Sequence, residues 1–479
     1  MEPLFSTLFP ATDKSVWQEQ VRKELKPAQN GEDGYESLRW HTGEGFVLDP
    51  YYTASDLIDG PLTALTLETT QAAQKRNPGW LNAPERTITT GKADNIYLRD
   101  ALTRGADALV LNIPGQANRI GDLLSRLLNG IKLSDTPVFF RLTSENATDF
   151  IQSLKTVAPY QLKGGLLMNT GNSTAEATRL TADSPQFRTI CASSHTFHNA
   201  GATATQELAF TLASLADTYD QLTSGGLTIE QLVHKTMVSM SVGTSYFLEI
   251  AKLRALRVLL TRFLSAYSFS LFSPLFVHCQ TSTFYDATTT YNTNLLRATT
   301  EAMAAVIGGC DVLTVHPYDA VLGKSTGLPD HEIPDNELLN HGLPDQKSPD
   351  SGFSDRIARN ISVLLKDESY LDKVADPSAG SYYIETLTHM LVEAAWALFL
   401  DVEKQGGFSK ALTNGFIQAE IERAYKAKID AVRNGKVLVG VTKFRFDEPS
   451  NQKDKLSKNH PAARLVGSLP EHRLAEEFE

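Results

Sequence analysis

Short apolar runs alternate with longer amphipathic stretches through the middle of the chain. Each apolar run has the length of a buried strand, and the stretch after it repeats its apolar residues at helical spacing. Eight strands are predicted on this basis, at Arg86–Thr90, Ala108–Ile113, Val138–Leu142, Gly165–Asn169, Phe187–Ala192, Met237–Val242, Leu275–Gln280 and Val312–His316. Strands that alternate with helices imply a parallel sheet, and eight such units favour closure into an α/β fold of the (β/α)8 TIM-barrel type. A doubly wound open sheet is the structural alternative.

The N-terminal region lacks this regular alternation. Residues 1–85 contain a short predicted helix at Ser15–Leu25 and are otherwise punctuated by proline and glycine. We interpret this region as an arm that packs either on the chain's own barrel or on a partner.

The barrel region is assigned to residues 86–445. It includes a segment rich in Pro, Gly, Asp, Asn and Ser at 323–355, which is predicted to be a long surface loop. The polar tail at 446–479 is expected to fray. Helices are predicted at Arg356–Leu365 and Ile384–Glu403, and a last strand-like run at Val437–Val441.

Charge and cysteine content narrow the classes of function. The formal net charge of -11 leaves no basic stripe for a nucleic acid. Three widely spaced cysteines argue against a disulfide framework and suit the cytoplasm. The N-terminus shows no signal pattern. The most apolar region, Leu256–Val277, is interrupted by Arg257 and Arg262, so it is interpreted as a buried helix and strand rather than a membrane span.

Candidate chemistry gathers in a predicted strand–loop–helix segment, Phe187–Gln206. His195 and His198 lie in its loop, at the carboxyl end of a barrel strand, where such folds build their sites. The alternative is that both are hydrogen-bonded surface groups. Gly323-Lys324-Ser325 imitates the end of a phosphate-binding loop, but Tyr318 stands where its first glycine should be, so that motif is rejected.

Several stretches in order along the chain resemble the methylmalonyl-CoA mutase family of cobalamin-dependent acyl-CoA mutases. They are Asn199–Ala213 (NAGATATQELAFTLA), Phe247–Arg257 (FLEIAKLRALR), His278–Ser282 (HCQTS), Leu295–Gly309 (LLRATTEAMAAVIGG), Ser354–Asn360, Asp376–Thr388, Asp401–Phe408 and Arg433–Phe444. The resemblance implies a (β/α)8 barrel whose axis holds the CoA chain, and an isomerase chemistry that begins with homolysis of the cobalt–carbon bond of adenosylcobalamin.

The position that the family uses for its catalytic histidine is altered. Active members read SGYH, then three residues, then AGA. Alignment on Ala200-Gly201-Ala202 places Thr196 at the histidine position and His195 one residue earlier. A shift of one residue at a strand end can turn a side chain to the opposite face, although a local gap would restore His195.

Other family positions are altered or retained. The segment 85–91 lacks the family's tyrosine, and GLLMNT at Gly165–Thr170 replaces the TIQND-type strand whose following arginine pairs with the substrate carboxylate. None of the eleven histidines has aspartate two positions before it, as the family's axial ligand requires. The resemblance assigns cofactor-facing positions to His278, Gln280 and Glu301, with His316 in place of a family Asn; alternatively these residues hold the strand ends together.

The resemblance leads to three functional hypotheses. The first is a non-catalytic small subunit without a cobalamin-binding domain, whose arm wraps a homologous large subunit that carries the active site and the adenosylcobalamin. The second is an active mutase barrel that uses a separate cobalamin-binding protein, with His195 as the general acid. The third and weaker one is a CoA-binding scaffold. The first hypothesis places the chain in a heterodimer that interconverts (R)-methylmalonyl-CoA and succinyl-CoA, in propionate metabolism.

Overall fold

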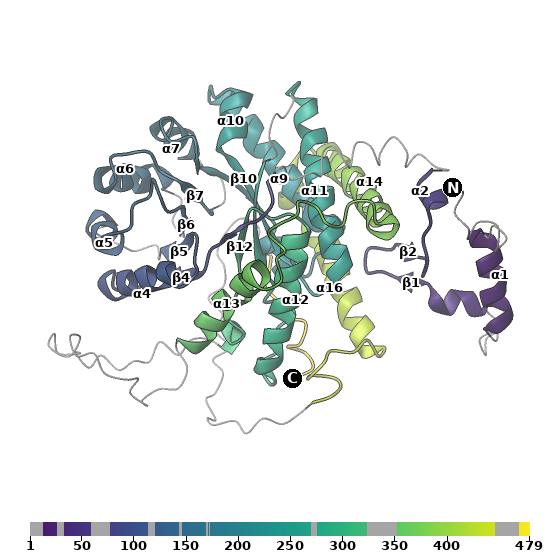
Figure 1. Ribbon diagram of the computed structural model, residues 1–479. Coiled ribbons are helices and arrows are strands. Elements are labelled where there is room, and N and C mark those ends of the chain that lie inside the picture. The colour runs from purple at the N-terminus through teal and green to yellow at the C-terminus, as the bar shows by residue number, and fades with distance from the viewer. Residues whose placement is uncertain are drawn as a thin grey trace, which may run out of the picture.

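The computed structural model describes residues 13–25, 33–58, 77–113, 120–142, 146–168, 171, 173–269, 275–322, 352–445 and 469–479. Parallel strands lie at the centre and helices surround them (Figure 1). Most of the predicted loop at 323–355, the end of the predicted fourth strand and the first part of the tail lie outside the described residues.

Two five-stranded parallel sheets form the centre of the fold. One has the order β4-β5-β6-β7-β8 and the other the order β3-β12-β11-β10-β9. The strands are β3 (Leu81–Asn82), β4 (Glu85–Thr87), β5 (Leu109–Ile113), β6 (Val138–Leu142), β7 (Gly164–Leu166), β8 (Phe187–Arg188), β9 (Ile190–Ser193), β10 (Thr236–Val242), β11 (Phe276–Thr281) and β12 (Val312–Thr314). This parallel α/β arrangement agrees with the predicted (β/α)8 type.

The two sheets are joined through interrupted strands. β3 and β4 are separated by Ala83 and Pro84, and β8 and β9 by Thr189. Pro84 has no N–H to give to a ladder, which explains why pairing changes there from β12 to β5. If each interrupted pair counts as one strand, the pairings pass through eight strands in order and return to the first.

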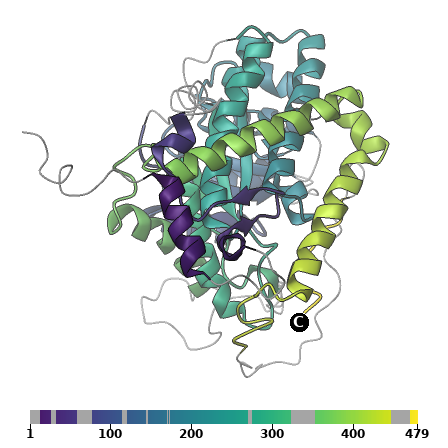
Figure 2. The same ribbon diagram turned by 90° about the vertical axis from the view of Figure 1, so that its right-hand side faces the viewer.

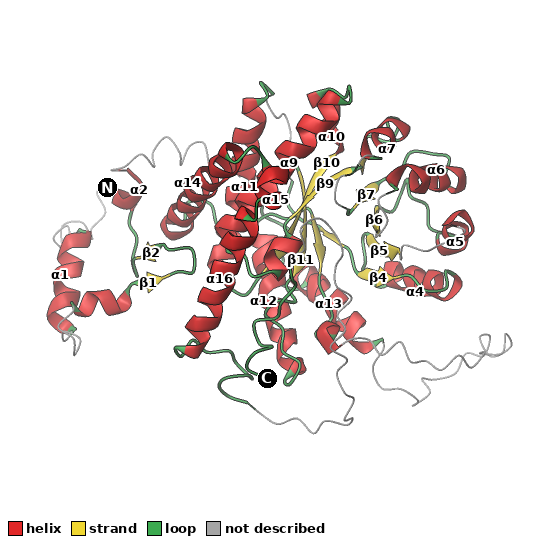
Figure 3. Ribbon diagram, turned by 180° about the vertical axis from the view of Figure 1, so that it is seen from behind, coloured by secondary structure: helices red, strands yellow, loops and turns green. Residues whose placement is uncertain are grey.

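The helices lie outside the strands (Figure 3). α4 to α7 cover the β4–β8 sheet, and the later helices cover the other. Their bounds are α4 (Lys92–Thr103), α5 (Ile120–Leu127), α6 (Ala147–Val157), α7 (Thr174–Leu180), α8 (His195–Asn199), α9 (Ala204–Ser224), α10 (Ile229–Lys235), α11 (Tyr246–Ala266), α12 (Asn294–Ile307), α13 (Phe353–Asp367), α14 (Tyr382–Lys404), α15 (Phe408–Thr413) and α16 (Phe416–Arg433). The described residues therefore contain one outer apolar core per sheet.

A third apolar cluster fills the space between the two sheets. It is contributed by strands of both, and its members are Ala83, Ala108, Val110, Phe139, Leu167, Cys191, Met237 and Val312. Side chains alternate along a strand, so the residues two positions further along β6, β10 and β11 continue this inner face toward the carboxyl ends.

A buried ion cluster fastens the C-terminal helices to the barrel. The Arg254 guanidinium on α11 lies 2.7 Å from a carboxylate oxygen of Glu385 on α14 and 3.1 Å from one of Asp376. Arg254 is 1% exposed. Two carboxylates therefore surround one buried guanidinium, an arrangement whose disruption leaves charges without partners.

The N-terminal arm packs on its own chain. It comprises α1 (Lys14–Glu24), a 3-10 turn (Gly34–Leu38), the hairpin β1 (Trp40–His41) and β2 (Val47–Leu48), and α2 (Ala54–Ile58). Figure 2 shows the arm beside α14. The Glu44 carboxylate in the hairpin accepts the backbone N–H groups of Ala204 and Thr205, each at 2.9 Å, in the first turn of α9.

Two predictions for the C-terminal region are wrong. Val437–Val441 forms no strand; the segment turns back on itself with an isolated bridge between Val439 and Lys443. The tail does not fray at residues 469–479, because the Leu474 side chain is buried against Phe284 and its N–H donates to the Phe284 carbonyl oxygen.

Candidate functional site at the carboxyl ends of the barrel strands

His195 lies at the start of α8, immediately after β9, and its ring is buried. Its Nδ1 is 2.7 Å from the Ser241 hydroxyl and its Nε2 is 2.7 Å from the Ser239 hydroxyl. Both serines lie on β10, on the same face as Met237 of the inner cluster. The ring therefore points into the barrel, whereas the Thr196 side chain beside it is exposed.

The hydrogen bonds continue from His195 across three more strands. Ser239 hydrogen-bonds His278 on β11 at 2.6 Å, and His278 hydrogen-bonds Thr314 on β12 at 3.0 Å. Thr314 donates in turn to the Ala83 carbonyl oxygen at 2.8 Å. This series of bonds occupies both ring nitrogens of both histidines.

Burial keeps the two histidines neutral. It lowers the pKa of His195 well below 6.5, helped by the positive charge of Arg141. Burial, again with Arg141, lowers the pKa of His278 to about 3. A neutral imidazole donates through one nitrogen and accepts through the other. Each ring can therefore donate a hydrogen bond to one hydroxyl group and accept a hydrogen bond from another.

A second polar group lies beside these histidines, at the carboxyl ends of the strands, here called the barrel mouth. Arg141 on β6 lies 3.1 Å from Glu85 on β4 and donates to the Gln280 amide oxygen at 2.9 Å. Burial would raise the pKa of Glu85, but Arg141 and His316 outweigh it and lower that pKa. His316 is held through its backbone N–H, which donates to the Thr281 hydroxyl at 2.8 Å.

Glu301 lies apart from this mouth group. It is 1% exposed on α12, and its Oε2 accepts the Ser282 backbone N–H at 2.9 Å. Burial, reinforced by Asp286, raises the pKa of Glu301 well above 4.5. The structure thus brings His195, His278, Gln280 and His316 together around the mouth and places Glu301 behind the loop that follows β11.

Sequence reasoning missed Glu85 and Arg141, and also a buried cluster around His198. The His198 ring hydrogen-bonds Glu207 and Ser282, and the Lys252 ammonium lies 3.1 Å from Glu207. Two features of the sequence could have indicated these buried polar groups. One is the arginine inside the apolar run VFFRL, and the other is the presence of charged residues inside apolar helices.

The residues assigned to a corrin do not fit that role in this arrangement. His278 is fully buried with both nitrogens bonded inside the barrel, and Gln280 is bonded to Arg141. Glu301 faces the loop after β11 rather than open space. No group of His, Cys, Asp and Glu within the described residues could hold a metal ion. The part of the chain that the structure describes also has no helix both long and apolar enough to cross a membrane.

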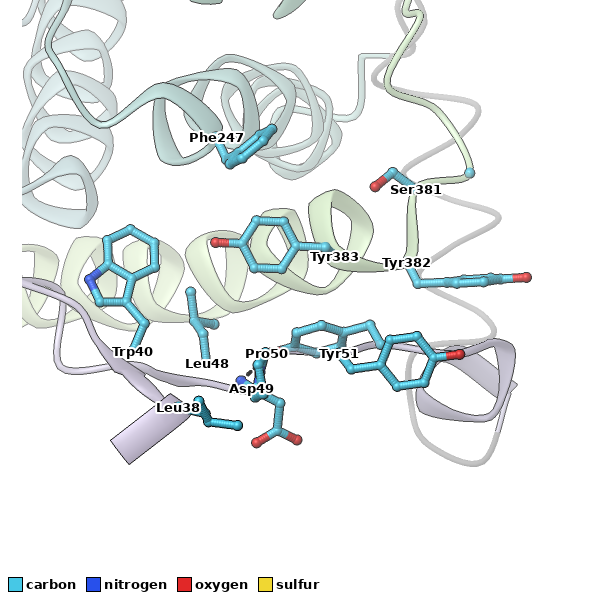
Figure 4. Close-up of a pocket in the computed structure, with 12 residues that line it drawn as sticks. Leu38, Trp40, Leu48, Asp49, Pro50, Tyr51, Phe247, Ser381, Tyr382 and Tyr383 are labelled. Atoms are coloured by element: carbon cyan, nitrogen blue, oxygen red, sulfur yellow. Dashed lines mark hydrogen bonds between the residues drawn. The ribbon is translucent and has the colours of Figure 1, made fainter. Parts of the chain in front are cut away.

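A cleft of about 670 Å³ lies between the arm and the N-terminal ends of α11 and α14. Aromatic rings from both sides line it, with Trp40 and Tyr51 on the arm, and Phe247 and Tyr383 on the helices (Figure 4). Its lining residues are separate from those of the barrel mouth.

Comparison with known proteins places this architecture in one family. A family model described as methylmalonyl-CoA mutase matches residues 167–329 and 345–473. The methylmalonyl-CoA mutase small subunit of Porphyromonas gingivalis is 30% identical, over 100% of this chain and 77% of that protein. The methylmalonyl-CoA mutase of Rhizobium meliloti is 29% identical, over 91% of this chain and 65% of its own length. A probable methylmalonyl-CoA mutase small subunit of Mycobacterium tuberculosis is 28% identical, over 88% of this chain and 69% of its own length. The chain belongs to the methylmalonyl-CoA mutase family.

Proposed function

We propose that this chain is a non-catalytic small subunit of a methylmalonyl-CoA mutase. It would support a homologous large subunit that carries the active site and interconverts (R)-methylmalonyl-CoA and succinyl-CoA. Two of the compared relatives carry the name small subunit, which supports the choice within the family.

The observation that carries the proposal is the filled barrel interior. The family resemblance implies that the CoA chain runs along the barrel axis. Here the Phe139 ring lies on the inner face, stacked on Phe276 at 6.0 Å and against His278 at 6.4 Å between ring centroids. The Arg141–Glu85 ion pair and the Gln280 amide lie across the mouth beside these rings.

Entry of an acyl-CoA chain would have to displace these groups. Separating the partners of this ion pair, whose side chains are 25% and 18% exposed, removes an attraction that water replaces only in part, so it costs binding free energy. Stacked aromatic contacts add to this cost. A barrel interior that is filled in this way favours a structural role in the complex over turnover of acyl-CoA by this chain.

The cofactor then belongs to the partner subunit. When adenosylcobalamin is bound there, it supplies the radical that starts the rearrangement. His278, Gln280 and Glu301 on this chain are engaged in internal hydrogen bonds, which supports assigning the corrin to the larger subunit. The proposal also places the complex in the cytoplasm, supported by three buried cysteines, none of which forms a disulfide bond.

The test is mutase activity with methylmalonyl-CoA and adenosylcobalamin. The purified chain should be inactive alone, and activity should appear in a complex with a homologous large subunit isolated from the same cells. Turnover by this chain with only a detached cobalamin-binding protein would overturn the proposal.

One observation favours the second hypothesis, an active barrel that uses a separate cobalamin-binding protein. The His195 ring points inward, where the general acid of such an enzyme would stand. If this chain turns over, His195→Gln should lower kcat by about 100-fold, the usual contribution of a general acid. The non-catalytic subunit predicts that the same variant leaves the activity of the heteromeric complex unchanged.

A further inference from the structure

His198 lies within a second arrangement of side chains, distinct from the barrel mouth. Its Nε2 is 2.7 Å from the Ser282 hydroxyl, and its Nδ1 is 2.8 Å from Glu207 Oε1. Ser282, His198 and Glu207 are 3%, 2% and 2% exposed. A hydroxyl, an imidazole and a carboxylate in this order are the parts of an activated serine nucleophile.

The surrounding hydrogen bonds fix the direction of proton donation. The Phe284 N–H donates to the Ser282 oxygen at 3.1 Å, so the hydroxyl is free to donate to His198 Nε2. Glu207 accepts from Nδ1–H and stays ionised, because the Lys252 ammonium and the hydrogen bond from His198 outweigh the effect of burial and lower the Glu207 pKa to about 2. The imidazole is therefore the tautomer that can take a proton from serine.

The Glu301 carboxyl group lies beside the backbone of the same serine. Its Oε2 accepts the Ser282 N–H, so in the neutral form, which the raised pKa favours, the proton is on Oε1. Oε1 is buried and has no hydrogen-bond partner among the described residues. A neutral carboxylic acid in an apolar site can stabilise an oxyanion by donating this proton in a hydrogen bond.

From this geometry we propose that Ser282 is a nucleophile for small acyl thioesters, with His198 as its general base and Glu207 as the residue that orients the imidazole. The activity would be hydrolysis and needs neither cobalamin nor a partner subunit. It is independent of the proposed role in the mutase.

Each step balances with water as the only co-reactant. The Ser282 oxygen bonds to the acyl carbon as its proton passes to His198 Nε2; the carbon–sulfur bond then breaks, and the thiolate leaves with that proton as a thiol. Water next gives a proton to His198 while its oxygen bonds to the acyl carbon, and the serine oxygen leaves and recovers the proton. The products are a carboxylic acid and a thiol.

The C-terminal strap, defined as residues 469–479, controls access to this serine. The Leu474 N–H donates to the Phe284 carbonyl oxygen at 2.8 Å, and the Phe284 ring lies 6.0 Å from the His198 ring. An Arg473 guanidinium donates to the Asp286 carbonyl oxygen at 3.2 Å. Because the strap lies on the loop that carries Ser282, small substrates are expected to enter when the strap lifts.

The test is covalent labelling of the full chain with diisopropyl fluorophosphate, followed by peptide mass spectrometry. The expected adduct is on Ser282, formed as the serine oxygen displaces fluoride. His198→Gln keeps hydrogen-bonding groups in place, and it should slow labelling by about 100-fold, the usual contribution of a general base. Ser194→Ala is the matched control, because Ser194 also bonds Glu207, at 3.1 Å, whereas the hydrogen bonds of the His198 ring go to Glu207 Oε1 and Ser282. It should label at the parent rate.

Two further measurements keep the proposal falsifiable. Leu474→Ala weakens the strap and should speed both Ser282 labelling and the release of thiol from acetyl-CoA. Absence of a Ser282 adduct in both the parent chain and this variant, with folding confirmed by circular dichroism, would overturn the proposal. Labelling that His198→Gln leaves unchanged would overturn it as well.

Discussion

Lowering the pH from 7 to 5 should destabilise the folded chain through His278. Burial and Arg141 hold the pKa of His278 at about 3 in the folded state, against an ordinary value of 6.5. Between pH 6.5 and about pH 3, His278 is protonated in the unfolded chain but not in the folded chain. The free energy of unfolding therefore falls as the pH falls through this range. Each pH unit below 6.5 removes about 1.4 kcal/mol, and pH 5 therefore removes about 2 kcal/mol through this residue alone.

The assay compares the parent chain with His278→Gln by reversible urea unfolding at pH 7, 6 and 5. The variant lacks the titrating ring, so its stability should fall less steeply with acid, and the difference between the two chains should shift by about 2 kcal/mol in favour of the variant. Phe139→Leu is the control. Phe139 lies against His278 but has no proton to exchange, so its destabilisation should be the same at all three pH values.

A constant difference between the parent and His278→Gln across this range would refute the reasoning. The same conclusion would follow from a histidine NMR titration in which the folded His278 ring takes up its proton near pH 6. The groups that face this ring, Ser239 and Thr314 by hydrogen bonds and Arg141 by its charge, would then fail to hold it neutral.

Three other substitutions test separate parts of the fold. Arg254→Leu should lower the free energy of unfolding by about 3–5 kcal/mol, because it leaves Glu385 and Asp376 buried without their cation. Calorimetry measures this loss, and a change below about 1 kcal/mol would contradict a stabilising role for the ion cluster. Glu44→Gln should lower the free energy of unfolding by about 1 kcal/mol and speed amide hydrogen exchange in the first turn of α9, because Glu44 caps that turn. Unchanged exchange rates in this turn would exclude a capping role for Glu44. Gly164→Ala should prevent stable folding, because Gly164 has φ +116° and an added Cβ would overlap the Val138 carbonyl oxygen. Normal expression with an unchanged melting temperature would contradict this.

Much of the strand framework could be predicted from the sequence, because a strand buried on both faces is a continuous apolar run. The change of partner at Pro84 was not predicted. It depends on which neighbour each half of the first strand meets, and no local pattern encodes that choice. The C-terminal strap was missed for a similar reason, since its polar composition hides the few apolar side chains, such as Leu474, that anchor it.

The site was harder to predict because its contacts join distant parts of the chain. The Arg141–Glu85 pair spans 56 residues and the Arg141–Gln280 bond spans 139, so neither leaves a local signature. Alignment placed Thr196 at the family's histidine position, but β9 ends at Ser193 and α8 begins at His195. That immediate entry into a helical turn decides which side chain faces inward, and spacing alone cannot reveal it.

The two interrupted strands form two boundaries between the halves of the barrel, at which the barrel can bend. At Ala83–Pro84 and at Thr189 the two sheets are connected by covalent backbone, while their ladders end on either side. Each sheet also keeps its own outer core with its own helices. A small rotation of one half against the other would therefore leave the strand register within each half intact and would be resisted mainly by the side chains packed between them. The two halves of the barrel are therefore held together mainly by the side chains along its axis. The size and packing of these side chains limit how far one half can rotate against the other.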